Sequence, residues 1–242
     1  MRSRLLIPAL VTVPSLAVLI GLGAWQWQRM GEKHVLIATV QERSIQTPEA
    51  FPAADRWASL DLASLAYRPV TVSGTFDHGR EAHVFFSLAK PVNGVGGPGY
   101  LIVTPLLVEG GGVVLINRGF VPADRKEPAS RQPGQAVGPV TLTGLIRLPE
   151  ARNRFAGEND PAKNVFYLRN PDEIARAKRL DHVAPVLIDQ RAPMPEGRLP
   201  MPGVTQIDIP NNHFQYALTW WSLAGCLAAI FALFARAKPD QS

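Results

Sequence analysis

The chain has 242 residues, 46% of them hydrophobic and 19% charged, a length that suits one domain together with membrane anchors. Its formal net charge is +5, but Lys and Arg are scattered and do not alternate with aromatic residues, which argues against nucleic-acid binding. The single cysteine, Cys226, excludes an internal disulfide and any cysteine-based zinc or iron–sulfur site.

The first predicted element is an apolar helix over residues 5–27 that is long enough to cross a membrane. Residues 5–25 carry no charged side chain, and about 20 apolar residues span a bilayer core. Pro8 and Pro14 are costly inside a soluble helix but are tolerated in a membrane-spanning one. A cleaved signal peptide is the alternative, although the apolar run exceeds the usual hydrophobic region of such peptides.

Residues 28–190 are predicted to form a mostly antiparallel, β-rich α+β domain with a few short helices. A helix is expected to continue over residues 29–47, and a short one to follow over residues 57–66. Residues 67–88 are predicted to form a β-hairpin around a turn at 77–80, because apolar and polar residues alternate on both sides of that turn.

A second hairpin is predicted from residues 100–108 and 113–121. The two runs are joined by Glu109 and three glycines, for which positive φ carries no steric cost. Residues 94–99 match the spacing of a dinucleotide-binding fingerprint, but that fingerprint must open a helix, whereas these residues lead into a strand. They are therefore interpreted as a loop between strands.

The remaining elements are expected to complete a barrel-like or sandwich sheet. Further strands are predicted at residues 139–148, 164–168 and 184–190. Residues 171–180 are expected to form a helix, with a proline at its first position and acidic residues in its first turn. Residues 191–212 contain repeated prolines and are predicted to be an extended linker without regular structure.

A second uncharged apolar helix is predicted over residues 213–235. Basic residues flank the two apolar helices toward the chain termini: Arg2, Arg4, Arg236 and Lys238. Short basic flanks stay in the cytoplasm, so residues 1–4 and 236–242 are predicted to be cytoplasmic tails and the domain between the helices to be periplasmic. Because the basic tail at residues 1–4 leaves no room for a mitochondrial transit peptide, a bacterial inner membrane is expected.

The sequence shows no catalytic or zinc-binding pattern. His78 and His83 are five residues apart, a separation that places them on opposite faces of a strand. No H-E-x-x-H or G-x-S-x-G motif occurs, and the carboxylates are dispersed. The chain is therefore predicted not to be an enzyme.

His213 is the main candidate for binding chemistry, because it begins the second apolar helix. Tyr216 and Trp220 follow on the same helical face. A neutral imidazole above an aromatic wall is suited to hold a porphyrin by its iron, and Trp25 and Trp27 of the first helix could close the other side. Alternatively, His213 caps the helix and the aromatic residues are ordinary interfacial anchors.

Four sequence blocks, in order along the chain, carry a family resemblance. They are residues 22–29 followed by Lys33, residues 67–76, residues 114–122 and residues 211–221. Together they resemble, in the same order, the blocks of the Surfeit locus protein one family of cytochrome c oxidase assembly factors. Phe120 stands where many relatives carry Trp, but an aromatic side chain is kept.

The resemblance implies an assembly factor that helps to build the haem-containing core subunit of the terminal oxidase. Some bacterial members bind haem a taken from haem a synthase, and the family's candidate iron ligand falls on His213, with its aromatic neighbour on Trp220. The expected haem a site is therefore His213 as metal ligand with Trp220, Tyr216, Trp25 and Arg29. The expected partners are the oxidase core subunit, haem a synthase and the lipid bilayer, with no nucleic acid.

The arginines of these blocks have two interpretations. Arg29, Arg68 and Arg118 could pair with haem propionates, since a planar guanidinium matches carboxylate geometry. Alternatively, Arg29 extends to the lipid headgroups and Arg118 anchors a strand end through local hydrogen bonds.

Two other functions stay open. A pure scaffold would hold the nascent core subunit or haem a synthase through the outer domain, with His213 in a structural role. A membrane-anchored redox enzyme acting on haem or quinol would need a cofactor site or a proton-transfer pair that the sequence does not show.

Overall fold

The computed structural model describes residues 2–152, 154, 156–204 and 211–236. The chain divides into two compact units, residues Met1–Thr39 with Asp208–Ser242 and residues Val40–Ile207, which we call the helical unit and the barrel domain. The last part of the predicted linker, residues 205–210, and the predicted tail beyond Arg236 lie outside the described residues, as do the side chains of residues 2–4.

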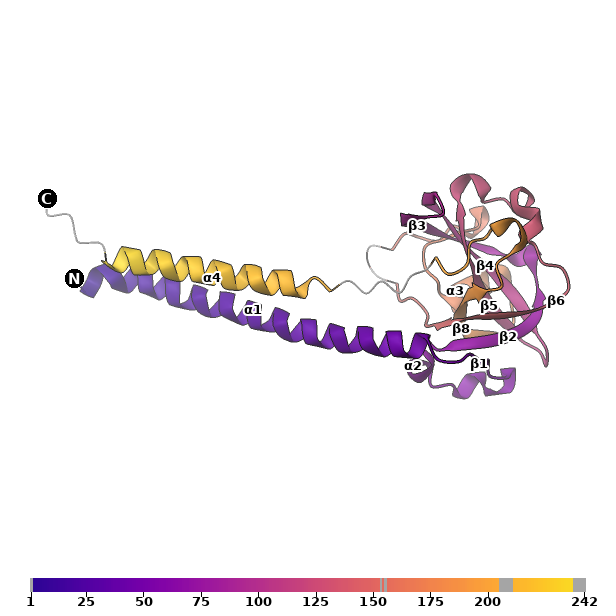
Figure 1. Ribbon diagram of the computed structural model, residues 1–242, viewed down its shortest axis with the longest axis horizontal. Helices are drawn as coiled ribbons and strands as arrows, with labels where there is room; N and C mark the ends of the chain where they lie inside the picture. Colours follow the sequence, from indigo (N-terminus) through magenta and orange to yellow (C-terminus); the bar gives the residue numbers. More distant parts are fainter. Residues whose placement is uncertain (1, 153, 155, 205–210, 237–242) are drawn as a thin grey trace. The chain divides into compact units, whose positions relative to one another are not determined.

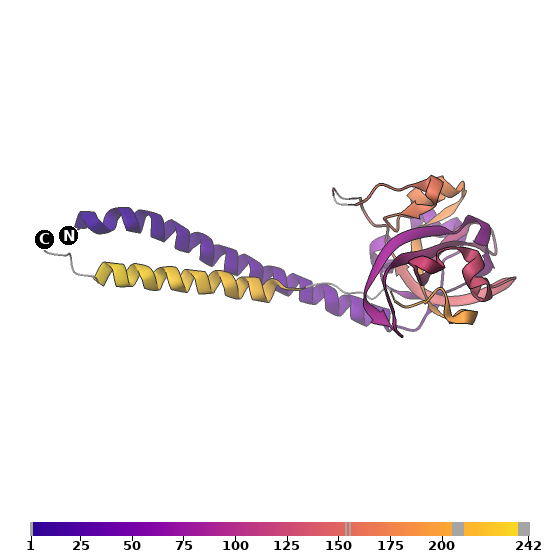
Figure 2. The ribbon, with the colours of Figure 1, turned by 90° about the horizontal axis from the view of Figure 1, so that it is seen from above.

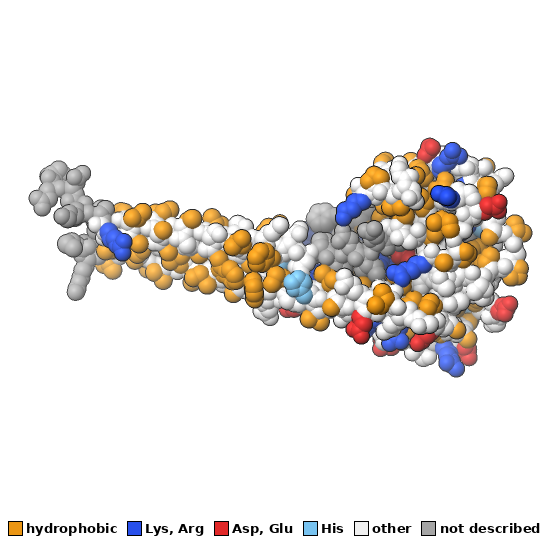
Figure 3. Space-filling model, in the orientation of Figure 1, with side chains coloured by type: hydrophobic (Ala, Val, Ile, Leu, Met, Phe, Trp, Pro, Cys, Tyr) orange, Lys and Arg blue, Asp and Glu red, His pale blue; other side chains and the backbone are white. Residues whose placement is uncertain are grey.

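Two long apolar helices form the helical unit (Figure 1). Helix α1 spans Arg2–Ser44 without interruption, so the predicted helices at 5–27 and 29–47 are one element. Helix α4 spans His213–Arg236. The two helices run antiparallel in both ribbon views (Figures 1 and 2), and hydrophobic side chains cover most of the face that Figure 3 shows. Both are long and apolar enough to cross a membrane.

Five strands of the barrel domain close into a ring. They are hydrogen-bonded in the order β2 (Pro69–Phe76), β6 (Pro139–Arg147), β8 (Val183–Ala192), β5 (Val113–Pro122) and β4 (Val95–Val108). Strand β4 then pairs with β2, from Gly74 opposite Val108 to Phe76 opposite Leu106, and this pairing closes the barrel.

Three further strands extend the sheet beyond the ring. Strand β3 (Ala82–Val92) pairs with β4, the two-residue β7 (Val165–Phe166) pairs with β3, and β1 (Glu49–Ala50) pairs with β2. The pairings β1–β2, β3–β7 and β5–β8 are parallel and the others are antiparallel. The prediction of a mostly antiparallel α+β domain with a barrel-like sheet is confirmed.

The strands bury side chains on both of their faces. Within β5, Val114 and Ile116 point into the barrel interior, whereas Leu115 belongs to a second core on the outer face. Helix α3 (Pro171–Lys178) covers this second core with Ile174, and its start is capped by the Asn170 side chain. Because both faces are covered, the strands read as nearly continuous apolar runs.

The predicted hairpin at residues 67–88 is wrong in its pairing, although both strands exist. Strand β2 pairs with β6 and β4, and β3 pairs with β4. Alternating polarity identifies a strand and its buried face, but it carries no information on which strand lies beside it.

The turn between β3 and β4 is Asn93–Gly94, and both residues have positive φ. This dipeptide is typical of a tight two-residue hairpin turn. The glycine-rich residues 94–99, interpreted as a loop, therefore belong to the turn and to the first part of β4. No helix follows them, as expected, which removes the dinucleotide-binding alternative.

The predicted helix at residues 57–66 is broken in two. A 3₁₀ helix covers Ala54–Ser59, and a short helix α2 covers Leu62–Leu65. The side chain of Asp61 accepts hydrogen bonds from the backbone N–H groups of Ala63 and Ser64. An aspartate cap of this kind begins a new helix rather than continuing an old one.

The predicted linker at residues 191–212 is more ordered than expected. Strand β8 continues to Ala192, and a 3₁₀ helix covers Glu196–Arg198. Met201 is 6% exposed and exchanges two backbone hydrogen bonds of 2.9 Å with Phe120 of β5. The prolines therefore exclude a long helix or strand but do not prevent this segment from packing on the barrel.

Candidate functional site

Helices α1 and α4 pack through small residues and aromatic rings. The Trp27 ring centroid lies 5.8 Å from that of Trp221 and 6.4 Å from that of Phe214. A Cβ atom on Gly23 would collide with the Trp221 indole, so the missing side chain allows the close approach. Ala217 of α4 is fully buried. The helical unit is therefore a packed pair and not two isolated helices.

His213, the first residue of α4, lies against α1. Its Nδ1 is 2.6 Å from Oε1 of Gln26. An amide oxygen can only accept a hydrogen bond, so Nδ1 carries the proton and Nε2 of the neutral ring keeps its lone pair. Nε2 has no hydrogen-bond partner within the part of the chain that the structure describes. Asn211 Nδ2 donates to the backbone oxygen of Met30 at 3.4 Å, one helical turn beyond Gln26.

The aromatic residues divide between two flanks of the helix pair. With about 100° of rotation per residue, Tyr216 and Trp220 lie within about 60° of His213 around α4, on the flank where His213 meets Gln26. Phe214 and Trp221 lie on the other flank, against Trp27. His213, Tyr216 and Trp220 therefore share one flank of α4.

Trp25 and Arg29, the other predicted site residues, are not in contact with His213. The face of α1 that meets α4 contains Gly23, Gln26 and Trp27, and Trp25 points away from this face, with 54% of its surface exposed. The Arg29 guanidinium is paired with Glu32 at 2.6 Å, and both side chains are about half exposed.

Gln26 is the contact that the sequence analysis missed. Its signal was available in the sequence, because it is a polar residue close to the end of an apolar segment, at the same predicted membrane depth as His213. The sequence alone does not say which turn of α1 faces the start of α4.

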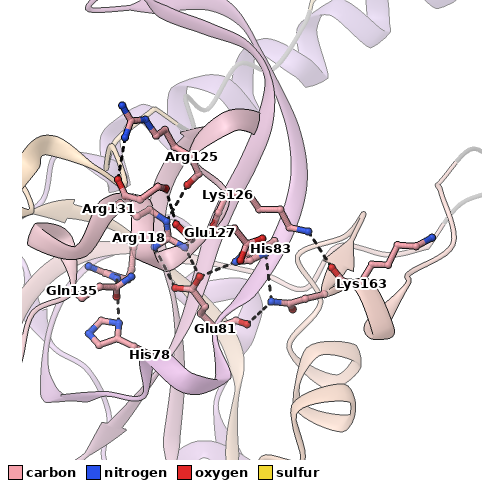
Figure 4. A network of polar contacts seen from close by, with 12 residues as sticks. His78, Glu81, His83, Arg118, Arg125, Lys126, Glu127, Arg131, Gln135 and Lys163 are labelled. Carbon is pink, nitrogen blue, oxygen red and sulfur yellow. Dashed lines mark hydrogen bonds and ion pairs between the residues drawn. The ribbon is translucent and has the colours of Figure 1, made fainter.

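A second group of polar side chains forms a buried cluster in the barrel domain (Figure 4). Glu81 accepts hydrogen bonds from both terminal nitrogens of Arg131 and, at 2.7 Å, from Nε2 of His83. The Arg131 and Glu81 side chains are 0% and 3% exposed. Asn164 Nδ2 donates to Nδ1 of His83 at 3.4 Å. Both ring nitrogens of His83 are therefore engaged in hydrogen bonds within the cluster.

Arg118 lies beside this cluster and is almost fully buried, with 1% of its surface exposed. It donates hydrogen bonds to the backbone oxygen of Gly134 and to Gln135, and its guanidinium stacks 4.7 Å above the Phe76 ring. Burial lowers the pKa of Arg118 to about 10, so the guanidinium stays charged at neutral pH. Arg118 lies within β5 rather than at its end, and its hydrogen bonds reach Gln135 and Gly134, which are 17 and 16 residues away in the chain.

Acid is expected to destabilise the barrel domain through Glu81. Burial raises the pKa of this carboxyl group, but hydrogen bonds from His83 and Arg131 outweigh it, and the pKa lies below its ordinary value of 4.5. The contribution of the ionised Glu81 carboxylate to the free energy of unfolding is therefore complete above about pH 4.5. It is lost as the pH falls through the lower pKa of the folded state, by up to about 1.4 kcal/mol per pH unit.

The measurement is the thermal unfolding midpoint of the full chain in detergent between pH 7 and pH 3. Glu81→Gln should be less stable at pH 7 and should lose less stability on acidification than the wild type. Asp124→Asn, at a side chain that is 78% exposed, serves as the control and should keep the wild-type slope. Equal slopes for wild type and Glu81→Gln would contradict the assignment.

The two units define a class of protein in which one chain contains a closed β-barrel domain and an antiparallel pair of long apolar helices. The chain matches the model of the SURF1 family over residues 14–225 and belongs to that family. The family resemblance of the four sequence blocks is thereby confirmed.

Individual relatives cover most of the chain. Surfeit locus protein 1 of Rattus norvegicus is 36% identical in an alignment of 243 positions that covers 95% of this chain and 76% of that protein. Surfeit locus protein 1 of Homo sapiens is 36% identical in an alignment of 233 positions that covers 90% of this chain and 75% of that protein. A SURF1-like protein of Drosophila melanogaster is 34% identical in an alignment of 229 positions that covers 89% of this chain and 73% of that protein.

Proposed function

We propose that this chain is a membrane-anchored assembly factor for cytochrome c oxidase that holds haem a at His213 as transient cargo. Membership of the SURF1 family and the sequence resemblance described above support the assembly role. The observation that carries the haem proposal is the His213 imidazole, whose Nδ1 is engaged by Gln26 and whose Nε2 is left with a free lone pair. The proposed partners are the oxidase core subunit and haem a synthase.

The residues around His213 fit a haem group chemically. A haem iron takes an imidazole nitrogen as axial ligand, and metal-bound histidines usually donate their other ring N–H to an oxygen acceptor, as His213 does to Gln26. Tyr216 and Trp220 supply flat aromatic surface on the same flank. Tyr216 is 56% exposed, so this flank is open, which suits a cargo that must be passed on.

Arg29 and Trp25 have supporting roles in this proposal. The Arg29 guanidinium lies on α1 one turn from Gln26 and is half exposed, so it is accessible to a carboxylate such as a haem propionate. Trp25 is an exposed ring about one turn before Arg29 on α1, which suits an interfacial position.

The proposal places both apolar helices across a bacterial inner membrane, with the barrel domain in the periplasm. Large hydrophobic side chains of both helices are more than half exposed: Leu6, Ile7, Leu10, Ile230 and Leu233. Such a surface is unfavourable in water and favourable in lipid. The start of α1 and the end of α4 lie at the same end of the unit, where the basic flanking residues favour the cytoplasmic side.

The test is the visible spectrum of the full chain, purified in mild detergent from cells that make haem a. Wild type should carry haem a, and His213→Ala should bind it at least about tenfold more weakly, because loss of the ligand itself must exceed the usual effect of losing an outer partner. His34→Ala, at an exposed histidine farther along α1, is the matched control and should bind haem as the wild type does.

A colourless wild type under these conditions would overturn the haem proposal. The barrel domain as a scaffold for the nascent core subunit or haem a synthase would then be the better account. A haem-loaded His213→Ala variant would keep the cargo but remove His213 as its ligand.

A further inference from the structure

We propose that Gln26 is a positioning residue that selects the tautomer of His213 and keeps this histidine a moderate, releasable ligand. The inference rests on the proposed haem function, but its first part concerns the protein without cargo. It starts from the 2.6 Å contact between Gln26 Oε1 and His213 Nδ1, which joins the two helices.

The tautomer follows from the chemistry of the two partners. A neutral imidazole carries one proton, on either of its nitrogens, and only the nitrogen without the proton can bind a metal. The Gln26 oxygen accepts a hydrogen bond and cannot donate one, so this contact stabilises the form with the proton on Nδ1. Nε2 is then the nitrogen available to a metal.

Other polar groups at the same end of the helix pair are engaged elsewhere. Asn211 Nδ2 donates to the backbone oxygen of Met30, and Arg29 is paired with Glu32. Within the described residues, Gln26 is the one side chain that is hydrogen-bonded to the His213 ring. The choice of tautomer therefore depends on a single neutral partner.

The neutrality of Gln26 bears on how strongly His213 donates to a metal. A carboxylate that accepts from a ligating imidazole draws the proton toward itself and raises the basicity of the other nitrogen. An amide oxygen orients the ring in the same way but draws the proton less. Gln26 thus orients the His213 ring without strongly raising the basicity of Nε2 toward the metal. A ligand of this kind suits a protein that holds an iron porphyrin only transiently.

The packing around Gln26 holds the amide in place. Gly23 and Trp27, its neighbours on the same face of α1, are in contact with α4 on either side of it along the helix. At a half-buried position the hydrogen bond is stronger than it would be in water.

The first test uses the full chain in detergent without haem, labelled with ¹⁵N in the histidine rings. The signal of His213 is assigned by its loss in His213→Ala. In the wild type its ring should carry the proton on Nδ1, and in Gln26→Leu it should show both tautomers. Gln28→Leu is the matched control, because Gln28 is exposed and turned away from α4, and it should keep the wild-type signal.

The second test loads the same proteins with haem a. Gln26→Leu should bind haem about 10–100-fold more weakly, as is usual when a metal-bound histidine loses its outer partner. Gln26→Glu should raise the iron–histidine stretching frequency of the ferrous form in resonance Raman spectra and slow the transfer of haem to apomyoglobin. Gln28→Leu should match the wild type in all three measurements.

The outcomes separate this inference from the proposed function. A wild-type His213 with its proton on Nε2, or a Gln26→Leu variant with unchanged tautomer and haem affinity, overturns the role of Gln26. If the wild type has the expected tautomer but binds no haem, the tautomer selection by Gln26 stands, and its role in ligand strength falls together with the haem proposal.

Discussion

Replacement of Arg131 by Met should lower the free energy of unfolding of the barrel domain by about 3–5 kcal/mol. The Arg131 guanidinium is fully buried and forms two hydrogen bonds to Glu81, whose side chain is 3% exposed. Without Arg131 the buried carboxylate keeps only its hydrogen bond from His83 and loses the charge with which it is paired. Removal of one partner of a buried ion pair is far more costly than removal of an exposed one.

The measurement is hydrogen exchange of the β4 and β5 amides in the full chain, because the slowest amides report global opening of the domain. Arg125→Met is the control: this arginine is 52% exposed, lies 3.8 Å from Asp124, and should change stability by less than about 0.5 kcal/mol. The double variant Glu81→Leu with Arg131→Met should regain part of the loss, since neither member of the ion pair is then left buried without the other. A small effect of Arg131→Met, similar to that of Arg125→Met, would show that the pair is not buried as described.

Gly119→Ala is the second change with a large expected effect, a loss of about 2–6 kcal/mol of stability. The φ angle of Gly119 is +119°, a conformation that costs about 1–3 kcal/mol for a residue with a side chain. A Cβ atom there would also collide with the backbone oxygen of Met201. The collision breaks the two hydrogen bonds between Phe120 and Met201, each worth about 0.5–1.5 kcal/mol.

This change acts on a specific segment, so its readout is local as well as global. Exchange of the Phe120 and Met201 amides should rise more than that of the opposite side of the barrel. Gly110→Ala is the matched control, because Gly110 also has positive φ, at +84°, but nothing lies within 4 Å of an added Cβ. Gly110→Ala should therefore show the cost of backbone strain alone. If Gly119→Ala destabilised the domain no more than Gly110→Ala does, Met201 would not lie against β5.

The Asn-Arg-Gly-aromatic block, which contributed to the family resemblance, is explained by these contacts. Arg118 joins β5 to the backbone of Gly134, Gly119 allows the segment after β8 to approach, and Phe120 pairs with that segment and fills the outer core. The sequence analysis identified the block but could not assign these roles, because each depends on residues far away in the chain.

Local signals in the sequence were sufficient for most of the elements. Apolar runs bounded by turn residues located β4, β5, β6 and β8, and a proline with acidic neighbours located α3. Apolar length located α1 and α4. Each of these signals lies within the element that it predicts, so no knowledge of the tertiary structure was needed.

Strand pairing could not be read from the sequence. Strands β2 and β3 are neighbours in the chain and are separated by a plausible turn, yet both pair with β4, at opposite ends of that long strand. The energy that decides this comes from closing the barrel over a shared core, and that energy is not a property of either strand alone.

In the candidate site, too, some features follow from the local sequence and others only from the tertiary structure. The amino-acid sequence by itself determined that His213, Tyr216 and Trp220 share one flank of a helix, because helical periodicity is a local property. Only the tertiary structure decided that Gln26 meets His213 and that Trp27, rather than Trp25, contacts α4. The physical reason is that the offset between α1 and α4 is set by the fit of Gly23 against Trp221, a contact between residues nearly two hundred positions apart in the chain.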